Sequence, residues 1–173
     1  MNLTLGELNF DTPDYIKEAA KKTLDEGQTH YTVNMHSRPA GGCGGTVPQD
    51  PLGRLYERRC KNVIITAGAL EGLAIALFAL IAPGDEVIVP DPCCPNYFGQ
   101  IQMVGAKAVP VPVYVDNDYR LQAAEHELYI FSDEPYDQLV YDGVETFSIA
   151  QVPEVRPQAV VLNSFSKFYA MTG

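Results

Sequence analysis

Residues 63–84 have the sequence VIITAGALEGLAIALFALIAPG, and this stretch indicates the fold class. The β-branched run at 63–66 predicts a short strand, and the apolar residues 70–82 predict a buried helix that ends at Pro83-Gly84. The few residues between them predict a tight turn. A strand joined directly to a buried helix is typical of α/β proteins.

Four further apolar runs predict the other strands of the sheet. They lie at residues 86–90, 107–113, 128–132 and 159–163. Their hydrophobicity is nearly continuous, which is typical of strands covered on both faces in a parallel sheet. Helices are expected at 95–104, before Gly105, and between Thr12-Pro13, an N-cap and first helical position, and Gly27. The predicted fold is α/β, a mostly parallel sheet with flanking helices.

The composition excludes several classes of protein. The chain has 173 residues, enough for one domain, and its 12 basic and 22 acidic residues give a net charge of −10, which disfavours nucleic acid as a partner. The longest apolar run, residues 73–82, is too short to span a bilayer. The four cysteines lack paired spacing, and residues 1–10 lack the features of a secretion signal. We therefore expect a cytoplasmic protein without a metal, nucleic-acid or membrane partner.

Chemically useful groups follow three of the predicted strands. Residues 66–71 open a helix whose free N–H groups would favour a phosphate, although glycine and alanine also suit the close packing of a turn. Asp133 could pair with a ligand cation or cap the turn that starts at Pro135. Lys167 is a candidate amine nucleophile or an ordinary surface lysine.

Together these segments resemble the pyridoxal-phosphate-dependent aminotransferases of fold type I, class I/II. The matching segments occur in the order typical of that family: Leu5-Gly6-Glu7, Phe10-Asp11-Thr12-Pro13, Thr29-His30-Tyr31-Thr32, Ile65-Thr66-Ala67-Gly68-Ala69, Pro83-Gly84-Asp85-Glu86-Val87, Asp91-Pro92, Ser132-Asp133-Glu134 with Tyr136, and Ser164-Phe165-Ser166-Lys167. The resemblance covers most of the chain except residues 33–62, an atypical, insert-like segment. It implies transfer of an amino group between an amino acid and a 2-oxo acid, with pyridoxal 5'-phosphate as cofactor.

The resemblance implies three catalytic residues. Lys167 would bond to the cofactor and later move a proton between the substrate α-carbon and the cofactor. Asp133 would pair with the pyridinium nitrogen, which keeps the ring an electron sink, and Tyr136 would donate a hydrogen bond to the phenolic oxygen.

The resemblance also implies further cofactor-binding residues. The phosphate would be bound by the N–H groups of Gly68, Ala69 and Leu70 and by the Ser164 hydroxyl. Cys94 occupies the place of an aromatic residue that stacks on the cofactor ring, and it is a poorer platform. Tyr31 would reach the phosphate bound by a neighbouring subunit, which implies a homodimer.

The chain departs from the family pattern in other places. A strand and an Asn-Pro segment expected between Arg120 and Glu127 are missing, and the chain ends before the family's phosphate-binding arginine and its C-terminal small domain. We therefore expect residues 1–173 to form a single, incomplete cofactor-binding (large) domain with weak or absent turnover.

An irregular, glycine-rich segment at residues 35–53 replaces an amphipathic helix of the family, and we expect it to be an exposed loop. Back-translation of residues 39–49, read one base downstream, permits the helix-like peptide LREAVAERYRK. We therefore hypothesise that this segment is frame-slipped, which the codons of the gene would decide.

Two other functions remain open. The chain could be a non-catalytic aminotransferase remnant that acts as a dimerisation or partial cofactor-binding module. Ser164 and Lys167 also match the Ser-x-x-Lys start of a serine acyl-enzyme pattern, but the Ser-Asp-Asn and Lys-Thr-Gly motifs that accompany it are missing.

Overall fold

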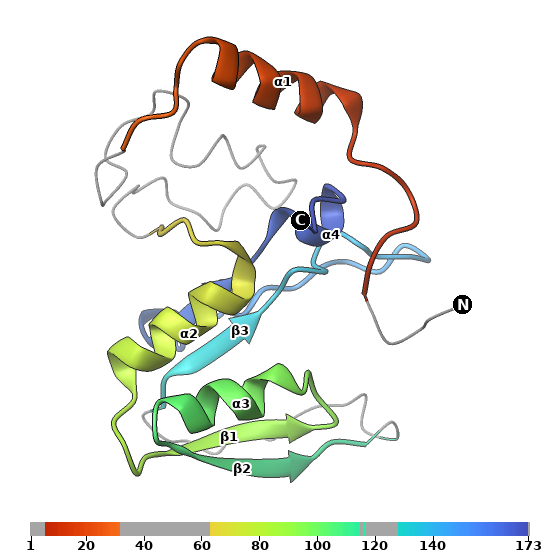
Figure 1. Cartoon of the computed structure of the whole chain (residues 1–173). Coiled ribbons are helices and arrows are strands. Elements are labelled where there is room, and N and C mark those ends of the chain that lie inside the picture. Colours follow the sequence, from red (N-terminus) through yellow and green to blue (C-terminus); the bar gives the residue numbers. More distant parts are fainter. Residues whose placement is uncertain (1–5, 32–62, 115, 117–127, 173) are drawn as a thin grey trace.

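The computed structural model describes residues 6–31, 63–114, 116 and 128–172 of the chain. In chain order the elements are α1 (Asp14–Asp25), α2 (Gly68–Leu80), β1 (Glu86–Asp91), α3 (Asn96–Met103), β2 (Lys107–Pro112), β3 (Ile130–Asp133), η3 (Ile149–Gln151), η4 (Arg156–Gln158), β4 (Ala159–Leu162) and α4 (Phe165–Phe168). The predicted fold class, α/β with parallel strands and flanking helices, is confirmed (Figure 1).

The strands of the described residues form two parallel pairs, where one sheet was expected. β1 pairs with β2, and β3 pairs with β4. The strand predicted at residues 63–66 is wrong, because these residues belong to no strand and Ile64 is 73% exposed. A β-branched run forms a strand only where a neighbouring backbone pairs with it and other side chains pack against it. In the described residues, the run at 63–66 pairs with no strand.

In the described part of the chain, one apolar core nevertheless joins the two pairs of strands. Its buried residues come from α2, β1, α3 with its C-cap, and β4: Leu73, Leu77, Val89, Ile101, Val104 and Leu162. Leu77 is only 1% exposed. The close packing of these side chains, rather than a continuous hydrogen-bonded ladder, connects β1–β2 to β3–β4.

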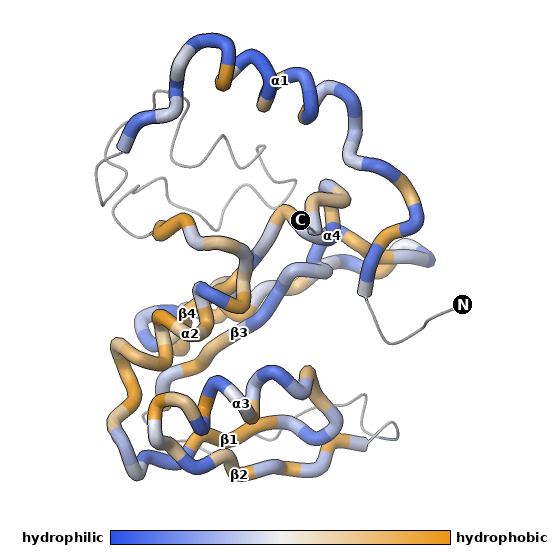
Figure 2. The backbone as a smooth tube through the Cα atoms, viewed as in Figure 1, coloured by the Kyte–Doolittle hydropathy of each residue, from blue (hydrophilic) through white to orange (hydrophobic). Residues whose placement is uncertain are grey.

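Helix α2 buries one face only. The sequence predicts burial on nearly every side, but Leu73 and Leu77 are its buried residues, while Ile75 is exposed and Phe78 is 61% exposed. Figure 2 shows the helix as mostly apolar, with a hydrophilic stretch near its start. A length of 13 residues also makes it too short to cross a membrane, and no other helix in the described part of the chain is long and apolar enough to do so.

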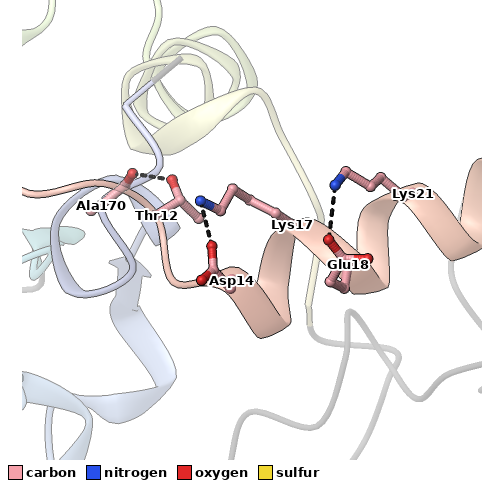
Figure 3. Close-up of polar contacts among 6 residues, drawn as sticks. All are labelled: Thr12, Asp14, Lys17, Glu18, Lys21 and Ala170. Atoms are coloured by element: carbon pink, nitrogen blue, oxygen red, sulfur yellow. Dashed lines mark hydrogen bonds and ion pairs between the residues drawn. The ribbon is translucent and has the colours of Figure 1, made fainter.

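The N-terminal helix α1 is confirmed, but it starts later than predicted. Thr12 is not its N-cap: Pro13 holds that position, and the Thr12 hydroxyl donates to the Ala170 carbonyl at 2.6 Å (Figure 3). Asp14 and Lys17 form an ion pair of 2.7 Å in the first turn. No residue of α1 is buried, and the helix lies apart from the strands (Figure 1).

Several sequence predictions fall outside the described residues. They concern the atypical segment 33–62, including the irregular stretch 35–53, and almost all of the junction between 115 and 128.

Candidate functional site

The carboxyl ends of β3 and β4 form the edge that carries the predicted catalytic residues. Asp133, the last residue of β3, is level with Leu162, the last residue of β4. The pairing continues one residue further, because the Glu134 N–H donates to the Leu162 carbonyl at 2.8 Å. The turn that holds Tyr136 and the helix that holds Lys167 therefore both begin at one edge, where parallel sheets bind ligands.

Lys167 and Tyr136 lie together at this edge. The Lys167 Nζ is 5.6 Å from the centre of the Tyr136 ring, so its positive charge faces the ring. The same Nζ donates a hydrogen bond to the Gly6 carbonyl. Ser164, at the N-cap of α4, accepts the Ser166 N–H at 3.3 Å, which leaves its own O–H able to donate.

Gly6 is a site residue that the sequence analysis missed. A β-carbon at this position would lie less than 3.0 Å from the Tyr136 hydroxyl oxygen and 3.3 Å from the Lys167 Nζ. The segment around Gly6 is held in place by the Thr12–Ala170 hydrogen bond and by a 3.3 Å hydrogen bond from Thr172 to Glu7. The glycine of the Leu5-Gly6-Glu7 motif was a signal, but spacing alone does not reveal what its backbone approaches.

Helix α2 lies against the end of β4 near its own N-terminus. A β-carbon on Gly72 would lie 3.2 Å from both the Leu162 side chain and the Thr66 hydroxyl, so the backbone of α2 approaches both residues closely. The predicted phosphate-binding turn is therefore close to the carboxyl end of β4.

Hydrogen bonds within that turn change the set of available N–H groups. The Gly68 N–H donates to the Thr66 carbonyl at 2.8 Å, and the Ala67 N–H donates to the Glu71 carboxylate. Gly68 therefore contributes its conformation, with φ of 76°, more than its N–H. Ala69 and Leu70, the other two predicted phosphate donors, follow within the first helical turn, whose N–H groups have no acceptor in the helix itself.

A second missed residue, Tyr97, contacts the predicted carboxylate. Its hydroxyl donates to the Asp133 Oδ2 at 2.6 Å. Burial of the ring, and then the neighbouring carboxylate, raises the pKa of the Tyr97 phenol well above its usual range. Cys94 lies one turn earlier, where its carbonyl accepts the Tyr97 N–H at 3.2 Å, and its side chain is half-buried.

The other carboxylates beside Asp133 bind the chain to itself. Glu134 accepts the Ser132 hydroxyl at 2.6 Å and the Ile149 N–H at 3.1 Å, which joins β3 to the start of η3. Asp137 accepts the Asn163 side-chain amide at 3.2 Å. Asp133 has one carboxylate oxygen on Tyr97, and its other oxygen remains able to accept from a ligand.

Tyr31 is not brought to this edge. Its side chain is fully exposed at the end of the segment that follows α1. The role that the sequence predicts for it, on a neighbouring subunit, stays a prediction.

Comparisons with known proteins identify the family to which the chain is similar. The family model for aminotransferases of class I and II matches residues 1–127 and 121–173. An aspartate aminotransferase of Pyrococcus horikoshii is 32% identical over 219 residues, which cover 100% of this chain and 53% of that protein. A (5-formylfuran-3-yl)methyl phosphate transaminase of Methanocaldococcus jannaschii is 34% identical over 206 residues, again 100% and 53%. The chain therefore spans about half the length of these relatives.

Solved structures show the same fold. An aromatic aminotransferase from Pyrococcus horikoshii superposes with a TM-score of 0.83 at 28% identity, covering 98% of this chain and 56% of the other. An aspartate aminotransferase from Thermotoga maritima has the same TM-score and identity, and the match covers 100% of this chain and 56% of the other.

Proposed function

This chain belongs to the aminotransferase class I and II family, and from that membership we propose that it binds pyridoxal phosphate and supports amino-group transfer between an amino acid and a 2-oxo acid. The family depends on pyridoxal phosphate. The observation that carries the proposal is the parallel pairing of β3 with β4, which puts Asp133 and the segment of Lys167 at one edge.

The residues at this edge fit the chemistry of pyridoxal phosphate. The carboxylate of Asp133 suits a cationic ring nitrogen, and the Tyr136 phenol suits a phenolic oxygen. The N–H groups of Ala69 and Leu70, at the positive end of α2, suit a phosphate, with the Ser164 hydroxyl as a further donor. Each hydrogen-bond donor of the chain is thus matched to an oxygen of the cofactor, and the carboxylate is matched to its cationic nitrogen.

Two groups of the chain contact the amine of Lys167. When bound, the cofactor supplies an electron sink for the bonds of the substrate α-carbon. The Gly6 carbonyl and the Tyr136 ring both stabilise a positive charge on the Lys167 Nζ. Loss of that proton would make the amine a nucleophile, and the same nitrogen is then placed to accept and return a proton during transfer.

We expect turnover to be weak. Cys94 is half-buried, and the family resemblance assigns it the place of a stacking ring, where a thiol would hold the plane of the cofactor less firmly. The Gly68 N–H is already committed to Thr66, which reduces the number of phosphate donors. These two observations also favour the alternative, a non-catalytic remnant that binds the cofactor in part.

We further propose that the described residues belong to one cofactor-binding domain, because one core joins all four strands. A homodimer and a cytoplasmic location remain predictions from the sequence.

Trapping of the cofactor on one lysine tests the proposed function. Pyridoxal phosphate added to the 173-residue chain should give the visible absorbance of lysine-bound cofactor, and borohydride reduction followed by peptide mapping should place it on Lys167. Lys167→Ala should abolish the band. Lys107→Ala is the matched control, because Lys107 is exposed and ion-paired with Glu86 at 2.6 Å on the other pair of strands. Equal labelling of Lys107 and Lys167 would contradict the assignment.

A further inference from the structure

We propose that Tyr97 is a positioning residue for Asp133: its phenol, held by the apolar core, fixes the carboxylate so that one oxygen stays free for a cationic ring nitrogen. This inference deepens the proposed function and rests on it. It concerns a residue of α3, which the family resemblance did not single out.

The contact joins two separate parts of the fold. Tyr97 lies in the first turn of α3, which packs against β2, and Asp133 ends β3, 36 residues later in the chain. The distance between the two oxygens, 2.6 Å, is typical of a hydrogen bond from a hydroxyl to a charged carboxylate. Apart from core packing, this bond is therefore a direct polar link from α3 to the catalytic edge.

The two partners differ in how firmly they are held. The ring of Tyr97 is half-buried and packs against the core residues. Asp133 is exposed, so its side chain could adopt several rotamers without a partner. A rigid ring with two side-chain torsions can therefore direct a mobile carboxylate, and the orientation of such a group strongly affects the chemistry it supports.

A phenol suits this role because it donates a hydrogen bond without carrying charge. Lysine or arginine at position 97 would neutralise Asp133 and compete with a cationic ring nitrogen. Burial, then Asp133, then the nearby Cys94 and Cys93 raise the pKa of Tyr97. The phenol therefore keeps its proton at neutral and mildly alkaline pH and remains a hydrogen-bond donor to Asp133.

Tyr97→Phe tests the proposal because it removes the hydroxyl and keeps the ring in the core. The affinity for pyridoxal phosphate should fall about tenfold, as expected for loss of a hydrogen bond to a charged group. Tyr141→Phe is the control, because the Tyr141 side chain is 76% exposed, and its affinity should equal that of the parent chain. In the Asp133→Asn background, Tyr97→Phe should cause little further loss, because the two residues act as a unit.

A second measurement follows Tyr97 without any cofactor. The protein is labelled with ¹³C-tyrosine, and the Tyr97 resonance is assigned by its absence in Tyr97→Phe. This resonance should titrate at lower pH after Asp133→Asn, because the substitution removes a negative charge that opposes ionisation of the phenol. An unchanged titration overturns the proposal.

The outcomes separate this proposal from the proposed function. Equal cofactor affinity of the parent and Tyr97→Phe overturns the positioning role alone. Equal losses from Tyr97→Phe in the parent and Asp133→Asn backgrounds also overturn it, because the two residues would then act independently. Failure of the parent chain to bind pyridoxal phosphate, with a Tyr97 titration that still responds to Asp133→Asn, overturns the proposed function and the positioning role with it.

Discussion

Gly6→Ala is a direct perturbation of the candidate site that spares the core. The added β-carbon would lie less than 3.0 Å from the Tyr136 hydroxyl oxygen, and an ordinary contact begins at 3.4 Å, so the two must separate by at least 0.4 Å. Tyr136 is 52% exposed, so its flexible side chain can swing into solvent while the backbone stays in place. The free energy of unfolding should therefore change by no more than about 0.5 kcal/mol.

The effect of Gly6→Ala on the site should be much larger. Displacement of Tyr136 removes its ring from the Lys167 ammonium group and its hydroxyl from the position expected for the cofactor's phenolic oxygen. The lost hydrogen bond to the phenolic oxygen contributes about 1–2 kcal/mol, which corresponds to an increase of roughly 5- to 30-fold in Kd for pyridoxal phosphate.

Urea unfolding and a cofactor titration on the same samples test both expectations. Gly99→Ala is the matched control, because a β-carbon there meets nothing within 4 Å. This control should bind the cofactor normally and raise the free energy of unfolding by about 0.5–1 kcal/mol, since Gly99 lies inside α3. An unchanged Kd in Gly6→Ala, or a loss of more than about 2 kcal/mol of stability, would refute the reasoning.

Three further expectations concern the fold. Leu77→Ala should lower the free energy of unfolding by about 2–5 kcal/mol in urea titrations, because Leu77 is 1% exposed in the core. Thr12→Val should speed amide hydrogen exchange in residues 6–12, as measured by mass spectrometry, because it removes the 2.6 Å hydrogen bond to Ala170. Hydrogen bonding and charge from Lys17 lower the pKa of Asp14. The pair should therefore stabilise α1 at pH values above the ordinary Asp14 pKa of 3.8, and this stabilisation should be lost as the pH falls below that value. Circular dichroism measured against pH checks this, because the Asp14→Asn variant should show no such pH dependence.

Most helices and strands could be predicted because local signals agree with the packing. In α2 and β1, continuous apolar residues and the Pro83-Gly84 stop mark the elements, and α3 ends before Gly105, whose φ is 76°. The strand predicted at 63–66 failed because a strand also needs a partner, which no local pattern contains. The same limit explains why one sheet was expected where two pairs of strands occur.

The candidate site could also be predicted from the sequence only in part. The place of Asp133 and Lys167 at strand ends follows from the chain order of parallel strands, so the sequence predicts it. Tyr97 and Gly6 reach these residues across 36 and 161 positions, respectively. Neither sequence spacing nor residue type specifies such contacts, because the packing of the core determines which distant segments meet.

The contacts that hold Asp133 and Lys167 also indicate which of the two is more sensitive to substitutions elsewhere in the chain. Asp133 is held by β4 and by Tyr97, and both supports are fixed to the buried core. Lys167 depends instead on the segment around Gly6, which has exposed side chains and is attached by the hydrogen bonds of Thr12 and Thr172. Because such surface hydrogen bonds open far more readily than a core, substitutions in residues 6–12 should alter the surroundings of the lysine while the rest of the fold and the carboxylate remain in place.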